Sequence, residues 1–361
     1  MTSTLTTSTK KSLIGMDLAE LEQYVVSLGL EKFRAKQIYK WIYSKWVRDY
    51  EQMTDLSKKA KELLSEATSL PIGTLKLIAR EISKDGTEKY LFETASGDKI
   101  ESVLMYFGDL SEDDGRYSAC ISSQVGCAVG CPFCATGALG FKKNLTAEEI
   151  IEQVLFMQNI NGHRISNIVY MGQGEPLNNY DAVIDSIDQM RNLVGIGVRH
   201  ITVSTSGVVP KMDKLADEDL QITLALSLHD PTDEGRDYLV PINRKWPVAQ
   251  VIQSMKDYVA KTNRRVTIEY VMLEDVNDSF EKAKALGNLV KGLHCNINLI
   301  PYNQTNVNDP FTRSNPRRIE EFSRVLEQYC AGKTITIRRE RGHDIQAACG
   351  QLAGAFSINR S

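Results

Sequence analysis

The most informative part of the chain runs Tyr117-Ser-Ala-Cys-Ile-Ser-Ser-Gln-Val-Gly-Cys127-Ala-Val-Gly-Cys131-Pro-Phe-Cys134. Residues 117–123 have the composition of a β-strand, and small or turn-forming residues separate the cysteines that follow. Three thiols on one tight loop are poorly placed for disulfides and well suited to a metal centre. We therefore predict a strand that leads directly into a metal-binding loop.

From this strand onward, β-rich runs alternate with stretches of helical periodicity. The helix expected over 148–158 begins with a capping box that joins Thr146 to Glu149. Repeated β–α units predict an α/β fold with a parallel sheet, either open and doubly wound or closed towards a barrel. Strands are expected at 117–123, 167–171, 200–204, 222–228, 266–272, 296–300 and 334–338, and further helices at 180–193, 247–262, 280–293 and 319–329.

Unusual polar motifs stand at the C-terminal ends of these strands. They are Gly172-Gln-Gly-Glu-Pro176, Ser204-Thr-Ser-Gly207, Ser227-Leu-His229 and Pro301-Tyr-Asn303. In α/β barrels, functional sites are built on that rim from the loops after several strands. We therefore expect the cysteine loop and these motifs to surround one cavity.

The chain before the first of these strands is organised differently. Residues 1–12 form a polar tail that we expect to be disordered, 13–72 a helical domain and 73–110 a β-meander linker, before the α/β domain at 111–361. The meander should contain strands over 75–83, 87–92 and 99–107. In the helical domain, residues 31–48 carry six Lys and Arg against one acid, interleaved with five aromatics. This pattern predicts helices that bury their aromatics, an RNA-contacting face, or both.

Composition restricts the class of protein. The 361 residues include 43 Lys and Arg against 46 Asp and Glu, a formal net charge of −3, which excludes a uniformly basic nucleic-acid coat. Basic residues are nevertheless concentrated in places, with eight against four acids over 311–342. No apolar stretch approaches the roughly 18 residues of a membrane span, and no signal-peptide core precedes residue 11. We expect a cytoplasmic protein, where thiols act as ligands or catalysts.

The three clustered cysteines leave one metal position open. A structural zinc site would need a fourth ligand, such as Cys120 or a distant histidine. An iron–sulfur cluster held by Cys127, Cys131 and Cys134 would instead expose one iron to an exchangeable ligand. We favour the iron–sulfur cluster over zinc and over a metal-free redox pair.

The spacing Cys-x3-Cys-x-Phe-Cys, followed one strand later by Gly-Glu-Pro, resembles the radical S-adenosylmethionine (SAM) superfamily. Two strings narrow the resemblance, Cys120-Ile-Ser-Ser-Gln-Val-Gly-Cys127 and Gly342-His-Asp-Ile-Gln-Ala-Ala-Cys349-Gly-Gln-Leu352. Both are similar to the RlmN/Cfr family of RNA methyltransferases. The motifs at 204–210, 240–243, 268–273 and 298–301 look more like the RlmN branch than Cfr.

The resemblance implies a fold, cofactors and a reaction. The fold would be a partial (βα)6-type radical SAM barrel with an RNA-binding N-terminal accessory domain. The three clustered cysteines would hold a [4Fe–4S] cluster, and two SAM molecules would be used per turnover. SAM contacts are implied for Gly174, Glu175, Ser204, Ser227, Leu228, His229 and Asn303. The product would be 2-methyladenosine in 23S rRNA and in tRNA beside the anticodon. The alternatives are C8 methylation, as in Cfr, and a non-catalytic metal-containing RNA-binding protein.

The resemblance also implies roles for three further residues. Cys349 would become methylated and then be joined to the adenine, and Cys120 would resolve this protein–RNA adduct, leaving a disulfide between the two. Glu101 would be the general base. From the residues alone, Cys120 would be a buried strand cysteine, Glu101 an acid on a solvent face and His229 a polar residue at a strand end.

The remaining expectations concern partners and differences from the family's usual sequence. The resemblance implies an external electron donor such as flavodoxin, and we expect a monomer without membrane contact. Gln173 stands where the family usually has Met, and His343 where an acid is common. Cys295 and Cys330 have no implied role, and we interpret them as structural.

Overall fold

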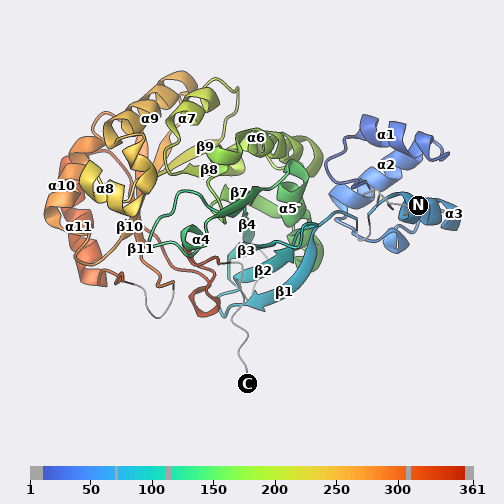
Figure 1. The fold of residues 1–361 in the computed structure, drawn as a ribbon, viewed down its shortest axis with the longest axis horizontal. Coiled ribbons are helices and arrows are strands. Elements are labelled where there is room, and N and C mark those ends of the chain that lie inside the picture. Colours follow the sequence, from blue (N-terminus) through green and yellow to red (C-terminus); the bar gives the residue numbers. More distant parts are fainter. Residues whose placement is uncertain (1–10, 70–71, 110–114, 306–309, 354–361) are drawn as a thin grey trace, which may run out of the picture.

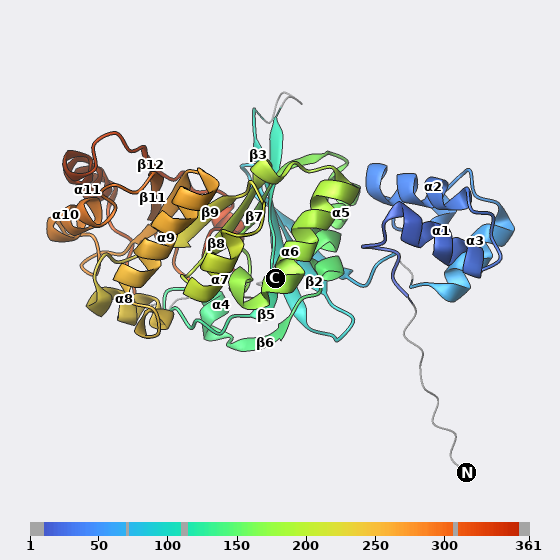
Figure 2. The ribbon, with the colours of Figure 1, turned by 90° about the horizontal axis from the view of Figure 1, so that it is seen from above.

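A computed structural model describes residues 11–69, 72–109, 115–305 and 310–353, so most of the expected tail lies outside the described residues. Among the described residues, ten strands form one curved sheet in the order β1-β2-β3-β4-β7-β8-β9-β10-β11-β12. Strands β4 and β7 to β12 run parallel to one another, which confirms the expected α/β fold. Helices cover the outer side of the curve, and the N-terminal helices lie beyond one end of it (Figures 1 and 2).

The strands are β1 Lys76–Ile82, β2 Glu88–Glu93, β3 Lys99–Phe107, β4 Arg116–Cys120, β5 Gln124–Gly126, β6 Phe141–Asn144, β7 Ile165–Tyr170, β8 Ile201–Thr205, β9 Thr223–Ser227, β10 Val266–Met272, β11 Cys295–Pro301 and β12 Ile335–Ile337. The α-helices are α1 Leu18–Ser27, α2 Arg34–Tyr39, α3 Lys58–Ala67, α4 Ala135–Ala138, α5 Ala147–Asn161, α6 Tyr180–Gln189, α7 Val209–Leu215, α8 Asp233–Leu239, α9 Val248–Thr262, α10 Phe280–Leu289 and α11 Pro316–Tyr329. Short 3₁₀ or π segments lie at Lys40–Ser44, Tyr50–Gln52, Pro176–Asn179, Met190–Val194, Val198–His200, Pro241–Arg244 and His343–Ile345.

Local signals explain the element that follows the cysteine loop. The Thr146 side chain accepts a hydrogen bond from the Glu149 N–H at 3.2 Å, and the Glu149 carboxylate accepts one from the Thr146 N–H at 3.0 Å. The predicted capping box of α5 is therefore confirmed. At its other end, Gly162 takes a left-handed conformation with φ of 79°, which stops the helix.

The three strands before β4 are continuous with the parallel strands. The expected strands at 75–83, 87–92 and 99–107 are β1, β2 and β3, and β3 pairs antiparallel with β4. The three strands of the meander are therefore part of the same ten-stranded sheet. The boundaries at 73 and 110 stay predictions.

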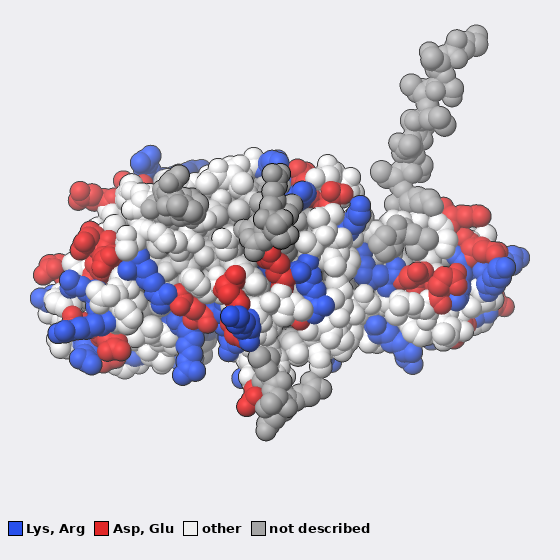
Figure 3. Space-filling model, turned by 90° about the horizontal axis from the view of Figure 1, so that it is seen from below, with Lys and Arg blue, Asp and Glu red and all other residues white. Residues whose placement is uncertain are grey.

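The N-terminal helices bury part of their aromatic set. Tyr43 is buried, and Tyr39, Trp41 and Trp46 pack partly buried against the same core, whereas Phe33 is half exposed. The expectation of buried aromatics is confirmed for Tyr43 and in part for Tyr39, Trp41 and Trp46. On the face in Figure 3, Lys and Arg are interspersed with Asp and Glu. No helix among the described residues is long and apolar enough to cross a membrane.

A buried ion pair joins the N-terminal domain to the sheet domain. The Arg48 guanidinium contacts the Glu152 carboxylate of α5 at 2.6 Å, and it lies over the Phe156 ring at 3.8 Å. The same carboxylate accepts hydrogen bonds from the backbone N–H groups of Thr74 at 2.8 Å and Leu75 at 2.9 Å. One buried carboxylate therefore connects a helix, the segment before β1 and the N-terminal domain.

We expect Arg48→Met to destabilise the protein by about 3 kcal/mol, because it leaves the Glu152 charge buried without its cation. Urea denaturation followed by circular dichroism measures the change. Lys58→Met is the control, since its pair with Glu62 is exposed and should contribute less than about 1 kcal/mol. Equal stability of the two variants would contradict this role of Arg48.

Candidate active site

The C-terminal ends of the parallel strands surround a cavity of about 170 Å³, as the strand-end motifs predict. Its wall includes the loop after β5, the loop after β7 and the ends of β8, β9 and β11. Ten of the predicted site residues line it, namely Cys127, Cys131, Cys134, Gly174, Glu175, Ser204, Ser227, His229, Asn303 and Cys349. We call this space the first cavity.

A short hairpin, β5 with β6, positions the cysteine loop. At its base, Gly126 has φ of 70°, and a Cβ there would lie 1.8 Å from the Gly140 carbonyl oxygen, so only glycine fits. The Cys127 N–H donates to that same carbonyl at 3.0 Å, and the Cys134 N–H donates to the Cys131 carbonyl at 3.1 Å. The three thiols are thereby held on one compact turn at the cavity wall.

The surroundings of the three thiols fit an iron–sulfur cluster. They pack against an apolar group that includes Val129, Phe133 and Tyr302. Burial raises the pKa of the Cys127 thiol to about 12 and also raises the pKa values of the Cys131 and Cys134 thiols. A metal centre removes those protons when it binds. No three His, Cys, Asp or Glu side chains in the described ranges converge closely enough to hold a single metal ion.

The Gly-Glu-Pro motif is fixed by its own carboxylate. Glu175 is buried, and one of its oxygens accepts hydrogen bonds from Thr205 Oγ1 at 2.7 Å and the Leu177 N–H at 3.1 Å. The other oxygen accepts from the N–H and the hydroxyl of Ser206, both at 2.7 Å. Burial raises the pKa of Glu175, and these hydrogen bonds oppose that shift. The motif loop is therefore tied to the end of β8.

A buried arginine ties the ends of β8 and β9 together. The Arg236 side chain is fully buried and donates to the carbonyls of Ser206, of Ser227 at 3.3 Å and of Leu228 at 3.2 Å. It also donates to Asn243 Oδ1 at 2.9 Å. Burial lowers the pKa of Arg236 to about 10, so the group still carries its charge at neutral pH. Leu228 is buried and does not line the first cavity, and its backbone carbonyl accepts the hydrogen bond from Arg236.

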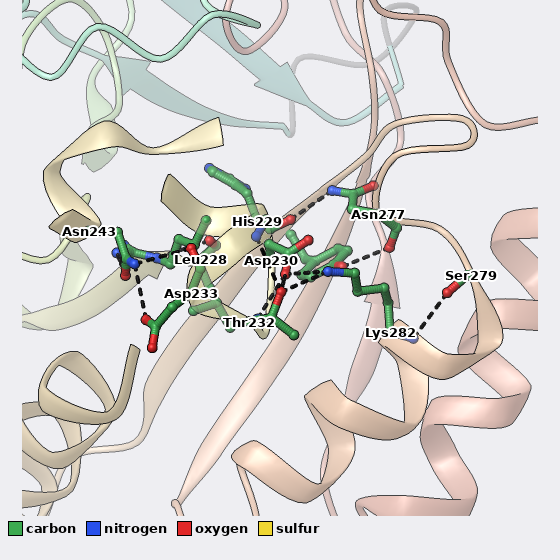
Figure 4. A network of polar contacts seen from close by, with 12 residues as sticks. Leu228, His229, Asp230, Thr232, Asp233, Asn243, Asn277, Ser279 and Lys282 are labelled. Atoms are coloured by element: carbon green, nitrogen blue, oxygen red, sulfur yellow. Dashed lines mark hydrogen bonds and ion pairs between the residues drawn. The ribbon is translucent and has the colours of Figure 1, made fainter. Parts of the chain in front are cut away.

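His229 takes a strained backbone conformation beside the cysteine loop. Its φ is 60°, and its carbonyl accepts a hydrogen bond from the Asn277 amide at 2.7 Å (Figure 4). Its Nδ1 accepts from the Val271 N–H at 3.1 Å, and its ring meets the Phe133 ring edge-on with centroids 5.0 Å apart. Burial and then Arg236 lower the pKa of His229 to about 3. The imidazole is therefore neutral, with its proton on Nε2.

We expect Arg236→Met to destabilise the protein by about 3 kcal/mol or more, because four buried acceptors lose their donor. Arg317→Met is the control, since Arg317 pairs with Glu321 at 2.9 Å on the exposed surface of α11 and should contribute less than about 1 kcal/mol. Chemical denaturation under anaerobic conditions compares the two. A loss for Arg236→Met no larger than that of the control would refute the role of Arg236 at the strand ends.

A second cavity of about 460 Å³ adjoins the first. The two share Met171, Ile300, Pro301, Asn303, Arg338, Cys349 and Gly350 as lining residues. Cys120 lines the second cavity from β4, where it pairs with Val103 of β3. The structure thus brings Cys120 and Cys349, 229 positions apart in the sequence, to one space. Burial raises the pKa of the Cys120 thiol to about 12, Cys349 adds to this, and the nearby Arg338 opposes it.

Hydrogen bonds hold the Cys349 loop against the cysteine loop. The Ala135 N–H donates to the Gly350 carbonyl at 2.8 Å, and Thr136 Oγ1 donates to the Leu352 carbonyl at 2.6 Å. Both donors belong to α4, directly after Cys134. The position of Cys349 is therefore set by the same turn that carries the three clustered thiols.

Glu101 lies apart from the predicted site. It is buried on β3, lines neither cavity, and its carboxylate accepts the Ala353 N–H at 2.7 Å. The expectation of a solvent-face acid is therefore wrong, because β3 is covered by the C-terminal segment. The two departures, Gln173 and His343, also line neither cavity: the Gln173 side chain is buried and His343 is exposed.

Two further charged residues line the first cavity, Glu269 of β10 and Arg338 after β12. Neither was predicted as a site residue from the sequence. Glu269 is buried, and its carboxylate accepts the Asn298 amide at 3.0 Å. An acid within the otherwise apolar run 266–272 could have indicated Glu269 as a site residue. No signal marked Arg338, because its importance comes from where the end of β12 falls beside Cys349.

Comparison with known proteins agrees with this geometry. The family model of the radical SAM superfamily matches residues 121–286, and that of the ribosomal RNA large subunit methyltransferase N-terminal domain matches residues 11–70. A probable dual-specificity RNA methyltransferase RlmN from Thermotoga neapolitana is 46% identical over 345 residues, covering 95% of this chain and 97% of the relative. One of the same name from Staphylococcus aureus is 44% identical over 348 residues, covering 95% and 93%.

A solved structure extends the comparison to the fold. The crystal structure of a radical SAM methyltransferase from Sphaerobacter thermophilus has 43% sequence identity and a TM-score of 0.87, and the match covers 95% of this chain and 99% of that chain. Sequence relatives and fold therefore agree over nearly the full length of each protein. The chain belongs to the dual-specificity RNA methyltransferase RlmN family, within the radical SAM superfamily.

Proposed function

We propose that this enzyme methylates C2 of an adenosine in 23S rRNA and in tRNA, using Cys349 as the methyl carrier and Cys120 as the resolving thiol. One observation carries the proposal. Cys349 lines both cavities, so it can face SAM on one side and a base on the other, and Cys120 lines the second cavity with it. Family membership makes the chain an SAM-dependent RNA methyltransferase with a [4Fe–4S] cluster.

The chemistry at C2 explains why such a carrier is needed. Adenine C2 lies between two ring nitrogens and is too electron-poor to attack a methyl cation equivalent. When bound, the cluster and SAM supply the radical that removes hydrogen from a methyl group. We assign the cluster to Cys127, Cys131 and Cys134. We assign SAM contacts to the predicted residues that line the first cavity and to the Leu228 backbone.

The two catalytic cysteines then act at successive stages of the reaction. Cys349 presents its methyl group to C2 and, after hydrogen is removed from that methyl group, becomes joined to the adenine through its carbon. The adenine would then lose the C2 proton to a base and one electron, for which the cluster would be the acceptor. The Cys120 thiolate attacks the Cys349 sulfur, so that an S–S bond forms as the S–C bond breaks. The electron pair goes to the released carbon, which takes up a proton to become the methyl product. An external electron donor must then reduce the disulfide.

We assign the removal of the C2 proton to Glu101. Glu101 lies on the same face of β3 as Val103, the partner of Cys120, but its carboxylate holds the Ala353 N–H. Glu101 can act as this base only after the C-terminal segment moves away. The proposal therefore includes that movement.

We assign RNA docking to the N-terminal domain and to the basic residues between 311 and 342. The interspersed charges in Figure 3 suit contacts to a folded RNA at selected places better than binding along a uniform coat. We further propose that the enzyme acts as a cytoplasmic monomer.

Nucleoside mass spectrometry of RNA from cells with and without this protein tests the proposal. We expect 2-methyladenosine in 23S rRNA and tRNA only when the protein is present. Finding 8-methyladenosine instead would indicate Cfr-like chemistry. Finding no protein-dependent methyladenosine would overturn the proposal and favour a non-catalytic RNA-binding role.

A further inference from the structure

One face of β3 runs along the second cavity from its floor to its mouth. Alternate residues of a strand share a face, and Val103, Met105 and Phe107 all line this cavity. Val103 is 2% exposed and pairs with Cys120, whereas Phe107 is 43% exposed and pairs with Arg116. The strand therefore leads from the resolving cysteine out to an exposed aromatic ring.

An arginine that also lines the second cavity covers one side of this ring. The Arg341 guanidinium lies 4.3 Å from the centroid of the Phe107 ring. The same group donates a hydrogen bond to the Tyr106 carbonyl at 2.7 Å, so it is held in place by the backbone of β3. Arg339 and Arg341 line the cavity, and Arg116 stands beside Phe107 across the strand pair. Glu340, the acid between these arginines, is already paired with Arg313.

We propose that Phe107, backed by Arg341, is a stacking site for the base of an RNA nucleotide next to the reacting adenosine. The inference rests on the proposed function and adds a contact that reads the RNA outside the reaction centre. Exposed aromatic rings beside arginines are the usual platform for unstacked bases of RNA, and the arginines attract the phosphates on either side.

The occupant is a neighbouring base and not the reacting one. The reacting adenine must reach Cys120 and Cys349, at the level of Val103. Phe107 lies four residues further along β3, which is about 13 Å at roughly 3.3 Å per residue. A base bonded to Cys349 cannot also stack on a ring at that distance. A neighbouring nucleotide of a single-stranded loop can do so, because its base can be splayed out of the stack.

The test measures binding of a synthetic RNA stem-loop with an unmodified adenosine in its loop, followed by fluorescence anisotropy. We expect Phe107→Ala to weaken binding about tenfold, which is the usual loss of one stacked base. Phe107→Trp should keep the affinity. Ile82→Ala is the control, because Ile82 is a similarly exposed apolar residue of β1 that lines neither cavity, and it should leave binding unchanged.

A second RNA, with an abasic nucleotide next to the adenosine, separates stacking from a structural effect. Two such RNAs are made, one lacking the base on the 5′ side of the adenosine and one lacking the base on its 3′ side. One of the two should bind the unchanged protein about tenfold more weakly than the complete RNA does. The Phe107→Ala variant should bind this abasic RNA no more weakly than it binds the complete RNA. Additive losses, or a Phe107→Ala loss no larger than that of Ile82→Ala, would overturn the stacking site.

The outcomes also distinguish this site from the reaction itself. Binding is measured without SAM, on protein whose iron content and circular dichroism match those of the unchanged chain. A stacking signature without any 2-methyladenosine formation would sink the proposed reaction and leave the site standing. Normal 2-methyladenosine formation, together with binding losses from Phe107→Ala and from the abasic RNA that add up, would overturn the stacking site and leave the proposed reaction standing. Absence of RNA binding by the unchanged protein would overturn both.

Discussion

Cys349→Ala should abolish RNA methylation, with a loss of at least about a thousandfold, because among the described residues no other thiol lines both the first and the second cavity. Cys349 lines both cavities, and its loop is tied through Gly350 to α4. Alanine keeps the small size of the residue and these backbone hydrogen bonds. The loss should therefore fall on chemistry and not on folding.

Anaerobic assays of 2-methyladenosine formation measure this loss, alongside iron and sulfide content. Cys330→Ala is the control, because Cys330 is buried, lines neither cavity and is a free thiol of the same kind. The variant and the control should both retain the cluster. Residual methylation by Cys349→Ala above one-tenth of the unchanged rate would rule out Cys349 as the carrier.

Cys120→Ala should stop the reaction one stage later and trap the RNA on the protein. Cys349 is still present, so the carbon bond to the adenine can form, but the thiol that attacks the Cys349 sulfur is missing. We expect a protein–RNA adduct that survives denaturing electrophoresis and disappears after nuclease treatment. The effect should approach one adduct per protein molecule, compared with a trace for the unchanged enzyme.

The double variant Cys120→Ala with Cys349→Ala is the control for this adduct. It lacks the attachment point, so no denaturation-resistant band should form. If the double variant gave the same band, the link would run through another residue. If Cys120→Ala gave no band and turned over normally, Cys120 would have no resolving role.

The parallel strands and the polar rim at their C-terminal ends could be predicted from the sequence because both follow from short-range patterns. Apolar runs separated by helical stretches predict parallel strands, and their C-terminal ends then share one edge. The polar motifs at Glu175, Ser204, Ser227 and Asn303 duly line one cavity. Helices α7 and α8 were missed because each has only seven residues, too few for a clear period.

The remaining parts of the site depend on long-range packing. Arg236 stands between Glu234 and Asp237 in the sequence, with no pattern that predicts burial, yet it is fully buried among strand-end carbonyls. Glu101 looked like a surface acid because nothing in its own strand reveals that Ala353, 252 positions later, donates a hydrogen bond to its carboxylate. The second cavity likewise forms only where β3, β4 and the Cys349 loop meet.

The joint at Glu152 limits how parts of such enzymes can be exchanged. Because its carboxylate serves Arg48, Thr74 and Leu75 together, the N-terminal domain cannot be replaced as a self-contained module at the first convenient boundary. A chimera that takes this domain from one relative and the barrel from another must keep the arginine and the glutamate matched across the junction. Substrate preferences carried by the N-terminal domain would then be inherited together with this one pair, which makes it the first position to inspect when such chimeras are built.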